Sequence, residues 1–360
     1  LHAWATYAVI GLALAYVSYN RGEPLTISAV LRPLIGRRVP WLEIAVDVLA
    51  VVATVCGVAT SLGLGAAQIN AGLSNLFGLT QSIGVQLAII GIVAAIATIS
   101  VASGLEKGIR RLSEWNMMLA AGLLLFILVV GPTVFVLDGF VQNVGYYVQH
   151  FFRLGTYSET YVGTTWQNGW TVFYWAWWIS WSPFVGMFIA RISYGRTVRE
   201  FVLGVLFVPT LLTFFWMTVF GNTALHLELF GPGGIVAAVD ASVANAMFVF
   251  LEHFPLSEVS SFLAIIIIVT FFVTSADSGA MVTDIIAAGG NAQRGPVQRS
   301  LWAVSLGAMA AVLLLAGGLA ALQTGAIVTG SPFALVLLAM CAAILQFMRE
   351  DYPHLAPATR

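Results

Sequence analysis

The stretch Phe173-Tyr-Trp-Ala-Trp-Trp-Ile-Ser-Trp-Ser-Pro-Phe184 holds four tryptophans within seven residues. It lies inside an apolar segment, 169–190, that is long enough to cross a lipid bilayer as a helix. The whole chain has the same character, because 59% of its residues are hydrophobic and only 9% are charged. Soluble domains carry about 25% charged residues. The sequence therefore predicts an all-α integral membrane protein.

The aromatic residues of this segment are spaced to share one helix face. Tyr174, Trp177, Trp178 and Trp181 fall at i, i+3, i+4 and i+7. The three tryptophans lie near the middle of the segment, away from the headgroup level where membrane tryptophans usually gather. Tryptophan faces attract a cation that lacks hydrogen-bond donors, such as trimethylammonium, by about 0.5–2 kcal/mol per face. A cation pocket is one interpretation, and packing within a helix bundle is the other.

Eight further segments could cross the membrane, so we expect nine transmembrane helices. The spans lie near 4–19, 44–64, 84–103, 114–137, 169–190, 201–222, 258–275, 299–321 and 330–347. Of the 15 basic residues, all but Arg153 fall in alternate connections, which the positive-inside rule assigns to the cytoplasm. The C-terminus is then cytoplasmic and Leu1 lies outside. Since the chain opens almost directly into a span, we expect an odd number of helices before it.

The two longest connections, 138–168 and 223–257, carry many apolar and aromatic residues. We expect both to form helices along the outer surface. The part that follows Asp138 has i, i+3, i+4 apolar spacing, which predicts an amphipathic helix. This helix lies either in the headgroup plane or against the protein itself.

A second candidate site is Phe271-Phe-Val-Thr-Ser-Ala-Asp-Ser-Gly279, near one end of its span. The adjacent hydroxyls of Thr274 and Ser275 could bind a small hard cation, especially if the helix unwinds there. The alternative is a helix terminus, in which Ser275 or Asp277 caps a following turn.

Other features exclude several classes of function. Cys56 and Cys341 lie in apolar runs and predict neither a disulfide nor a metal site. A net charge of −1 argues against a protein that binds nucleic acid. We find no nucleophile with a partnered base in the sequence, so nothing in it indicates an enzyme. Asp47 is expected to reach the interface or to pair with an arginine. The run Ser61-Leu-Gly-Leu-Gly65 predicts a close helix contact.

Several motifs together resemble the betaine/choline/carnitine transporter family. The longest is Trp175-Ala-Trp-Trp-Ile-Ser-Trp-Ser-Pro-Phe-Val-Gly-Met-Phe-Ile-Ala-Arg-Ile-Ser193, followed by Gly195-Arg-Thr-Val-Arg-Glu-Phe201. Four shorter matches spread the resemblance over nearly the whole chain: His2–Tyr7, Ala59–Gly65, Gly221–Leu225 and Thr274–Ala280.

The resemblance implies twelve membrane helices, ten of which form two inverted five-helix repeats. The first span here matches the family's fourth helix, which implies that three preceding helices are missing from this chain. The resemblance implies that residues 1–137 are the rest of the first repeat and that 138–168 are an outer connecting segment. Residues 169–349 would form the second repeat, and 350–360 the start of a cytoplasmic tail.

The resemblance also implies roles for individual residues. Trp4 and Tyr7 would face Trp178 across an aromatic box for trimethylammonium. The inner path would be lined by Phe173, Trp177 and Trp181. A sodium site would use Phe271, Thr274 and Ser275. In sodium-coupled betaine carriers a second hydroxyl follows Thr54 by one turn, and here that position is Val58, which leaves either H⁺ or Na⁺ as the coupling ion.

The function expected from these features is uptake of a quaternary-ammonium osmoprotectant across the inner membrane of a prokaryote. The residues Pro24–Ala29 and the run Asn168-Gly-Trp-Thr look closest to choline importers, so choline is the first expectation. Sodium-coupled transport of glycine betaine or carnitine is the alternative within the class, and a non-transporting osmosensor is the alternative outside it. The family resemblance further implies a homotrimer, with no organic cofactor.

Overall fold

The computed structural model describes residues 1–36, 39–103, 106–291 and 295–355, and the regular elements within them are helices. In chain order they are α1 His2–Arg21, α2 Ile27–Ile35, α3 Pro40–Phe77, α4 Ile83–Ser103, α5 Glu106–Val130, α6 Thr133–Gln149, α7 Phe151–Thr156, η1 Asn168–Val172, α8 Phe173–Ile192, α9 Val198–Met217, η2 Thr218–Asn222, α10 Thr223–Phe230, α11 Ile235–Ala241, η3 Val243–Asn245, α12 Ala246–Glu252, α13 Ser257–Ala287 and α14 Pro296–Leu355. The predicted all-α class is confirmed.

Six helical stretches in the described ranges are long and apolar enough to cross a membrane. They are Pro40–Phe77, Ile83–Ser103, Arg110–Val130, Val198–Phe230, Ser257–Ala287 and Pro296–Asp351. Helices α1 and α8, each of 20 residues, cover two more of the predicted spans but fall outside this set. The count of nine and the two repeats remain predictions.

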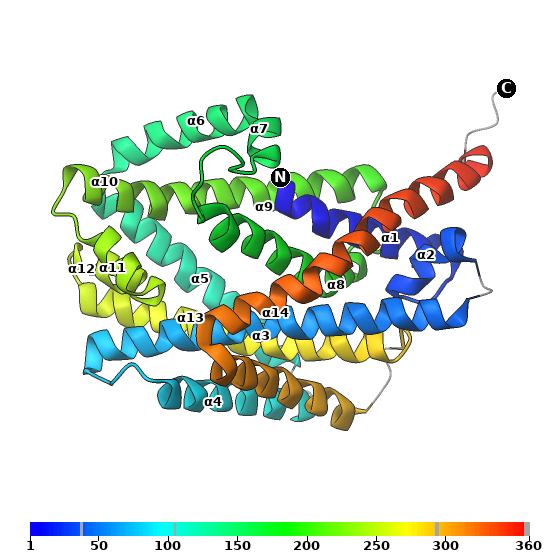
Figure 1. Ribbon diagram of the computed structural model, residues 1–360, viewed down its shortest axis with the longest axis horizontal. Helices are drawn as coiled ribbons and strands as arrows, with labels where there is room; N and C mark the ends of the chain where they lie inside the picture. Colours follow the sequence, from blue (N-terminus) through cyan, green and yellow to red (C-terminus); the bar gives the residue numbers. More distant parts are fainter. Residues whose placement is uncertain (37–38, 104–105, 292–294, 356–360) are drawn as a thin grey trace.

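Figure 1 shows how these helices are arranged. Helix α3 crosses the molecule with α13 beside it, and α14 passes over α3; both packing contacts are extensive. Helix α4 packs on the first half of α14, whereas α1 packs on α8 and α9. The connecting segment α6–α7 lies along one edge of the molecule, against α9.

Two predicted boundaries in the first half of the chain differ from the structure. Helix α3 has 38 residues, or about 57 Å at 1.5 Å per residue, so the predicted span 44–64 is only its middle. Helix α5 ends at Val130 and α6 begins at Thr133, which places the expected boundary at 137/138 inside α6. The connection 223–257 contains the short helices α10, α11 and α12, and is helical as expected.

The predicted connection at 322–329 is wrong, because this part of α14 is helical. The hydroxyls of Thr324 and Thr329 each donate to the carbonyl four residues earlier, so they do not interrupt the helix. The break lies earlier, at Gly317 and Gly318. Gly318 has φ 61° and ψ −138°, a conformation that only glycine adopts readily.

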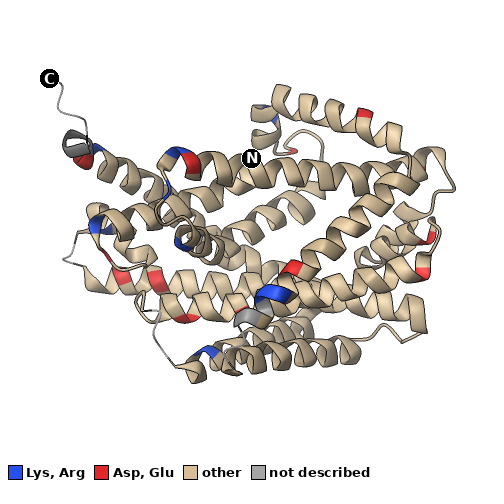
Figure 2. Cartoon of the chain, turned by 180° about the vertical axis from the view of Figure 1, so that it is seen from behind, with Lys and Arg blue, Asp and Glu red and all other residues tan. Residues whose placement is uncertain are grey.

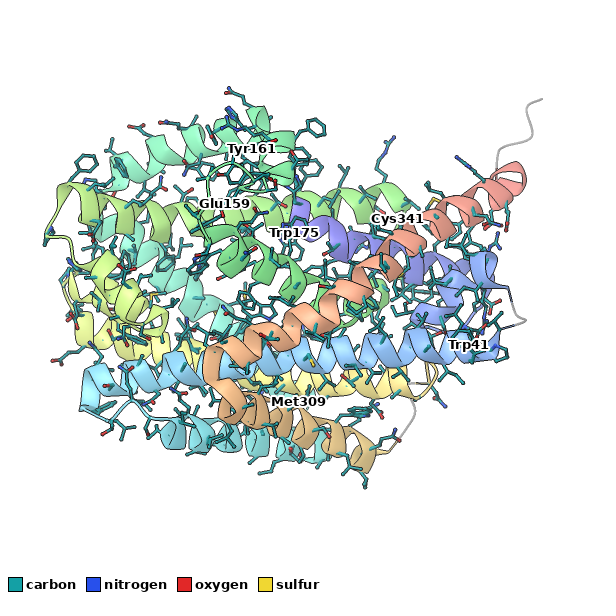
Figure 3. All side chains as sticks on the ribbon, viewed as in Figure 1. Trp41, Glu159, Tyr161, Trp175, Met309 and Cys341 are labelled. Carbon is teal, nitrogen blue, oxygen red and sulfur yellow. The ribbon has the colours of Figure 1, made fainter. Side chains whose placement is uncertain are left out.

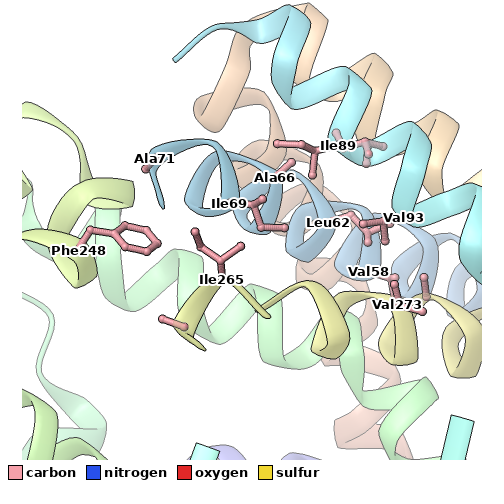
Figure 4. Packing of buried hydrophobic residues seen from close by; sticks show 14 of the residues in the cluster. Val58, Leu62, Ala66, Ile69, Ala71, Ile89, Val93, Phe248, Ile265 and Val273 are labelled. Atoms are coloured by element: carbon pink, nitrogen blue, oxygen red, sulfur yellow. The ribbon is translucent and has the colours of Figure 1, made fainter. Parts of the chain in front are cut away.

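The hydrophobic core forms where α3, α4 and α13 meet. In Figure 4, Val58 and Leu62 of α3 lie beside Val273 of α13 and Val93 of α4, and all four are buried. A Cβ atom on Gly65 would lie 1.9 Å from Cε2 of Phe272, so only glycine allows this approach of α3 to α13. The predicted close helix contact at Ser61–Gly65 is confirmed.

Charged residues are unevenly distributed over the molecule. In Figure 2 the end formed by α10, α11 and α12 carries acidic residues without basic ones. At the opposite end, the Nη2 atom of Arg21 donates to Asp351 at 2.7 Å and to Glu350 at 2.9 Å, which joins the end of α1 to the end of α14. Of the basic residues used to predict the topology, Arg37, Arg38, Arg294 and Arg360 lie outside the described residues, as does 356–360 of the expected tail.

The carboxylate of Asp47 binds the first turn of α2, which was not expected. The backbone N–H of Ser28 donates to Oδ1 at 2.9 Å, and the Ser28 hydroxyl donates to Oδ2 at 2.6 Å. From the sequence, Asp47 was predicted to reach the membrane interface or to pair with an arginine, because the sequence could not show that α2 folds back onto α3. Asp47 therefore holds these two helices together.

Replacing Asp47 by alanine should lower the free energy of unfolding by about 1–3 kcal/mol, because the backbone N–H of the buried Ser28 loses its acceptor and the Ser28 hydroxyl keeps only the Thr26 hydroxyl, at 3.1 Å. The measurement is the thermal unfolding midpoint of the purified protein in detergent. Val48→Ala on the exposed face of the same helix is the matched control, and equal shifts in the two variants would contradict this role.

Candidate functional site

The strongest candidate site forms where α1 packs along α8. Tyr7 is stacked on Trp178, with ring centroids 5.0 Å apart and planes inclined by 24°. Trp4 meets both rings edge-on, at 5.5 Å from Tyr7 and 5.6 Å from Trp178. These three residues, here called the aromatic cluster, are brought together from positions more than 170 residues apart in the chain.

The aromatic cluster is closed in this structure. Centroid separations of 5.0–5.6 Å correspond to direct contact between rings. A trimethylammonium group bound between Tyr7 and Trp178 would need each ring about 4–6 Å from the cation, hence a spacing nearly twice as wide. Binding between these faces therefore requires the rings of Tyr7 and Trp178 to move apart.

The other aromatic residues of α8 do not form one stripe with Trp178. Phe173 is buried and stacks on Trp177 at 5.3 Å. The indole N–H of Trp177 donates to the carbonyl of Gly57 and to the hydroxyl of Ser61, each at 3.2 Å. Trp177 thus faces α3, whereas Trp178 faces α1. Sequence spacing predicted the shared helix and missed this division, because it does not show which neighbours the helix has.

Trp181 connects these two regions. It packs against the residues around Tyr7 and also against the main core, and its ring is 5.3 Å from that of Phe184. Its indole N–H and that of Trp4 are buried without a hydrogen-bond partner among the described residues. Buried donors of this kind usually have a partner, so both indoles are available to an acceptor group on a bound solute.

The second candidate, on α13, lies in regular helix. Because α13 continues to Ala287, Ser275 and Asp277 cap no turn, and the helix-terminus alternative is wrong. The Thr274 hydroxyl donates to the carbonyl of Phe271 at 3.0 Å, and the Phe271 side chain is 54% exposed. Ser275 is half-buried. These three residues occupy adjacent turns but do not enclose a site within the described part of the chain.

Thr54 on α3 differs from Thr274. It is fully buried, and its hydroxyl has no hydrogen-bond partner among the described residues. Val58, one turn later, is also fully buried and belongs to the main hydrophobic cluster. A cation beside Thr54 would therefore meet an apolar side chain where a second hydroxyl would be needed.

The chain was compared with known proteins. The model of the betaine/carnitine/choline family transporters, BCCT, matches residues 1–353. The chain belongs to this family. As a BCCT protein it is a multi-pass membrane protein, and the predicted family is confirmed.

Individual BCCT relatives match nearly the whole chain. It is 46% identical to the glycine betaine transporter OpuD of Bacillus subtilis, covering 100% of this chain and 70% of the relative. A glycine betaine/proline/choline transporter of Vibrio parahaemolyticus is 45% identical, with 98% of this chain and 63% of the relative covered. A glycine betaine transporter of Acinetobacter baylyi is 44% identical, with 98% and 53% covered. The chain thus spans less than two thirds of the length of the last two.

Proposed function

We propose that this BCCT protein is a secondary active transporter that imports a quaternary-ammonium osmolyte by alternating access. The observation that carries the proposal is the aromatic cluster of Trp4, Tyr7 and Trp178, in which three aromatic rings from α1 and α8 are in mutual contact. Such rings bind a cation that has no donors of its own. Phe173, Trp177 and Trp181 would line the path on the α3 side of the cluster.

Glycine betaine is the first substrate candidate and choline the second. All three relatives described above have glycine betaine in their names, whereas choline appears in one. Both solutes combine a trimethylammonium group with an oxygen acceptor. The unpartnered indole N–H groups of Trp4 and Trp181 could donate to that acceptor.

The closed aromatic cluster supports the alternating-access part of the proposal. Since no cation fits between Tyr7 and Trp178 at 5.0 Å, the site must open to bind and can close again afterwards. A site of this kind, between helices that rock against each other, is open to one side of the membrane at a time. Coupling to Na⁺ or H⁺, a cytoplasmic C-terminus in the inner membrane and assembly as a homotrimer belong to the same proposal.

The test is uptake by the full-length protein in cells that lack their own betaine and choline carriers. We expect saturable accumulation of radiolabelled glycine betaine, inhibited by excess unlabelled choline and abolished when the sodium and proton gradients are both collapsed. Binding to the purified protein without uptake would favour a non-transporting osmosensor. If the protein neither binds nor takes up glycine betaine or choline, the proposal is overturned.

A further inference from the structure

The first turn of α1 is attached to the connecting segment α6–α7 through the side chain of His2. A hydrogen bond of 2.9 Å joins Nδ1 of His2 to the hydroxyl of Tyr147 on α6. The imidazole ring also stacks on Phe151 of α7, with centroids 4.0 Å apart and planes inclined by 14°. Both the polar edge and the face of the ring are therefore used.

Gly155 of α7 is the third residue that lies close to the His2 ring. A Cβ atom on Gly155 would lie 2.8 Å from Nε2 of His2, which is closer than side chains approach. Tyr147, Phe151 and Gly155 together are here called the socket. The imidazole fills the socket so closely that a single methyl group on Gly155 would displace it.

The socket is itself braced by neighbouring helices. The Tyr147 ring packs edge-on against Phe214 of α9 at 4.9 Å. On its other side, His2 meets the edge of Trp175, at 6.4 Å. Figure 3 shows Trp175 on α8 beside the start of α1. The position of His2 is thus set by three elements other than its own helix.

We propose that His2 is a positioning residue for the substrate site: seated in the socket, it holds the first turn of α1 so that Trp4 and Tyr7 meet Trp178. Trp4 follows His2 by two residues and Tyr7 by five, on one helix, so a shift of the first turn is transmitted to both rings. The inference rests on the proposed function and assigns the segment α6–α7 a part in substrate binding.

The experiment compares His2→Ala, Gly155→Ala and the double variant with wild type, all in the full-length protein. Since one hydrogen bond and its packing are lost, each single variant should raise the solute concentration for half-maximal glycine betaine uptake about five- to tenfold, without changing the maximal rate. The double variant should be no worse than His2→Ala alone, because the ring that the new methyl group would strike is gone.

His150→Ala is the matched control. His150 is a half-buried imidazole on the same segment, but among the described residues the stacking and the polar contact of its ring stay within that segment: it stacks on Tyr146 at 4.1 Å, and its Nδ1 lies 3.0 Å from the Tyr146 carbonyl. Its replacement should leave uptake unchanged. Tyr147→Phe is the mild variant that removes only the hydrogen bond to His2. If its uptake is low, the dissociation constant for glycine betaine can be measured in detergent by tryptophan fluorescence.

The outcomes separate this inference from the proposed function. Wild type that neither takes up nor binds glycine betaine or choline overturns the proposed function. Wild-type transport combined with an unchanged half-saturation in His2→Ala overturns the role of His2. The role of His2 is also overturned if the two substitutions lower the unfolding midpoint additively and leave the affinity for glycine betaine unchanged. That result would show that His2 only stabilises the fold.

Discussion

Replacing Trp178 by leucine is expected to abolish saturable uptake of glycine betaine while leaving the protein in the membrane. Trp178 is in contact with both other rings of the aromatic cluster, so its loss removes one cation–π face and the surface on which Tyr7 is stacked. Loss of the Trp178 face and displacement of the Tyr7 face, at about 1–2 kcal/mol each, correspond to a fall in affinity of more than tenfold. Initial uptake rates over a range of solute concentrations, with membrane levels measured in parallel, test this expectation.

Trp170→Leu is the control for this prediction. Trp170 belongs to the same helical run and is 37% exposed, and among the described residues its ring stacks on Tyr174, at 6.0 Å. It should retain wild-type affinity. Trp178→Phe should fall between the two, because phenylalanine keeps a smaller aromatic face. Normal half-saturation in an inserted Trp178→Leu protein would remove the aromatic cluster from the binding site.

Replacing Gly65 by valine should have the largest effect on stability. A Cβ atom there would lie 1.9 Å from the Phe272 ring, and valine adds two further carbons to this contact between α3 and α13. We expect the free energy of unfolding to fall by about 3 kcal/mol or more, because neither helix backbone can move without opening the core. The unfolding midpoint in detergent measures this loss.

The comparison for Gly65 is Gly91→Val on α4. Gly91 is also helical, but no other group lies within 4 Å of the position its Cβ would take. The intrinsic penalty of valine in a helix is then the same in both variants, and only the clash differs. Adding Phe272→Ala to Gly65→Val should restore part of the stability. If the two valine variants unfold alike, α3 and α13 do not make this contact in the protein.

Prediction from sequence succeeded where a property depends on local composition or regular spacing. The helix around Trp178, the helical nature of 223–257 and the close contact at Gly65 were all expected and are present. The boundaries were less accurate. Helix α3 passes 64 and α14 continues through 322–329, because a helix does not stop where its residues become less apolar. It stops or bends where the backbone requires it, as at Gly318.

For the candidate site, the residue types were predictable and their partners were not. Family resemblance placed Trp4 and Tyr7 opposite Trp178, and the structure brings these rings together. The spacing of α8 joined Trp177 to Trp178, although they face different helices. His2 lies at the beginning of the first predicted span, and its partner Tyr147 lies 145 residues away in the sequence. A tyrosine in an aromatic amphipathic helix carries no signal that could have identified it.

The sequence by itself determined that this chain is an α-helical membrane protein with a tryptophan-rich helix, since hydrophobicity and helical spacing are properties of neighbouring residues. Only the tertiary structure decided which tryptophans face α1, that Asp47 binds α2, and that His2 is seated in the socket. Each of these depends on two segments that are distant in the chain and meet only after the helices pack. Side-chain direction and packing, which spacing alone does not specify, decide those contacts.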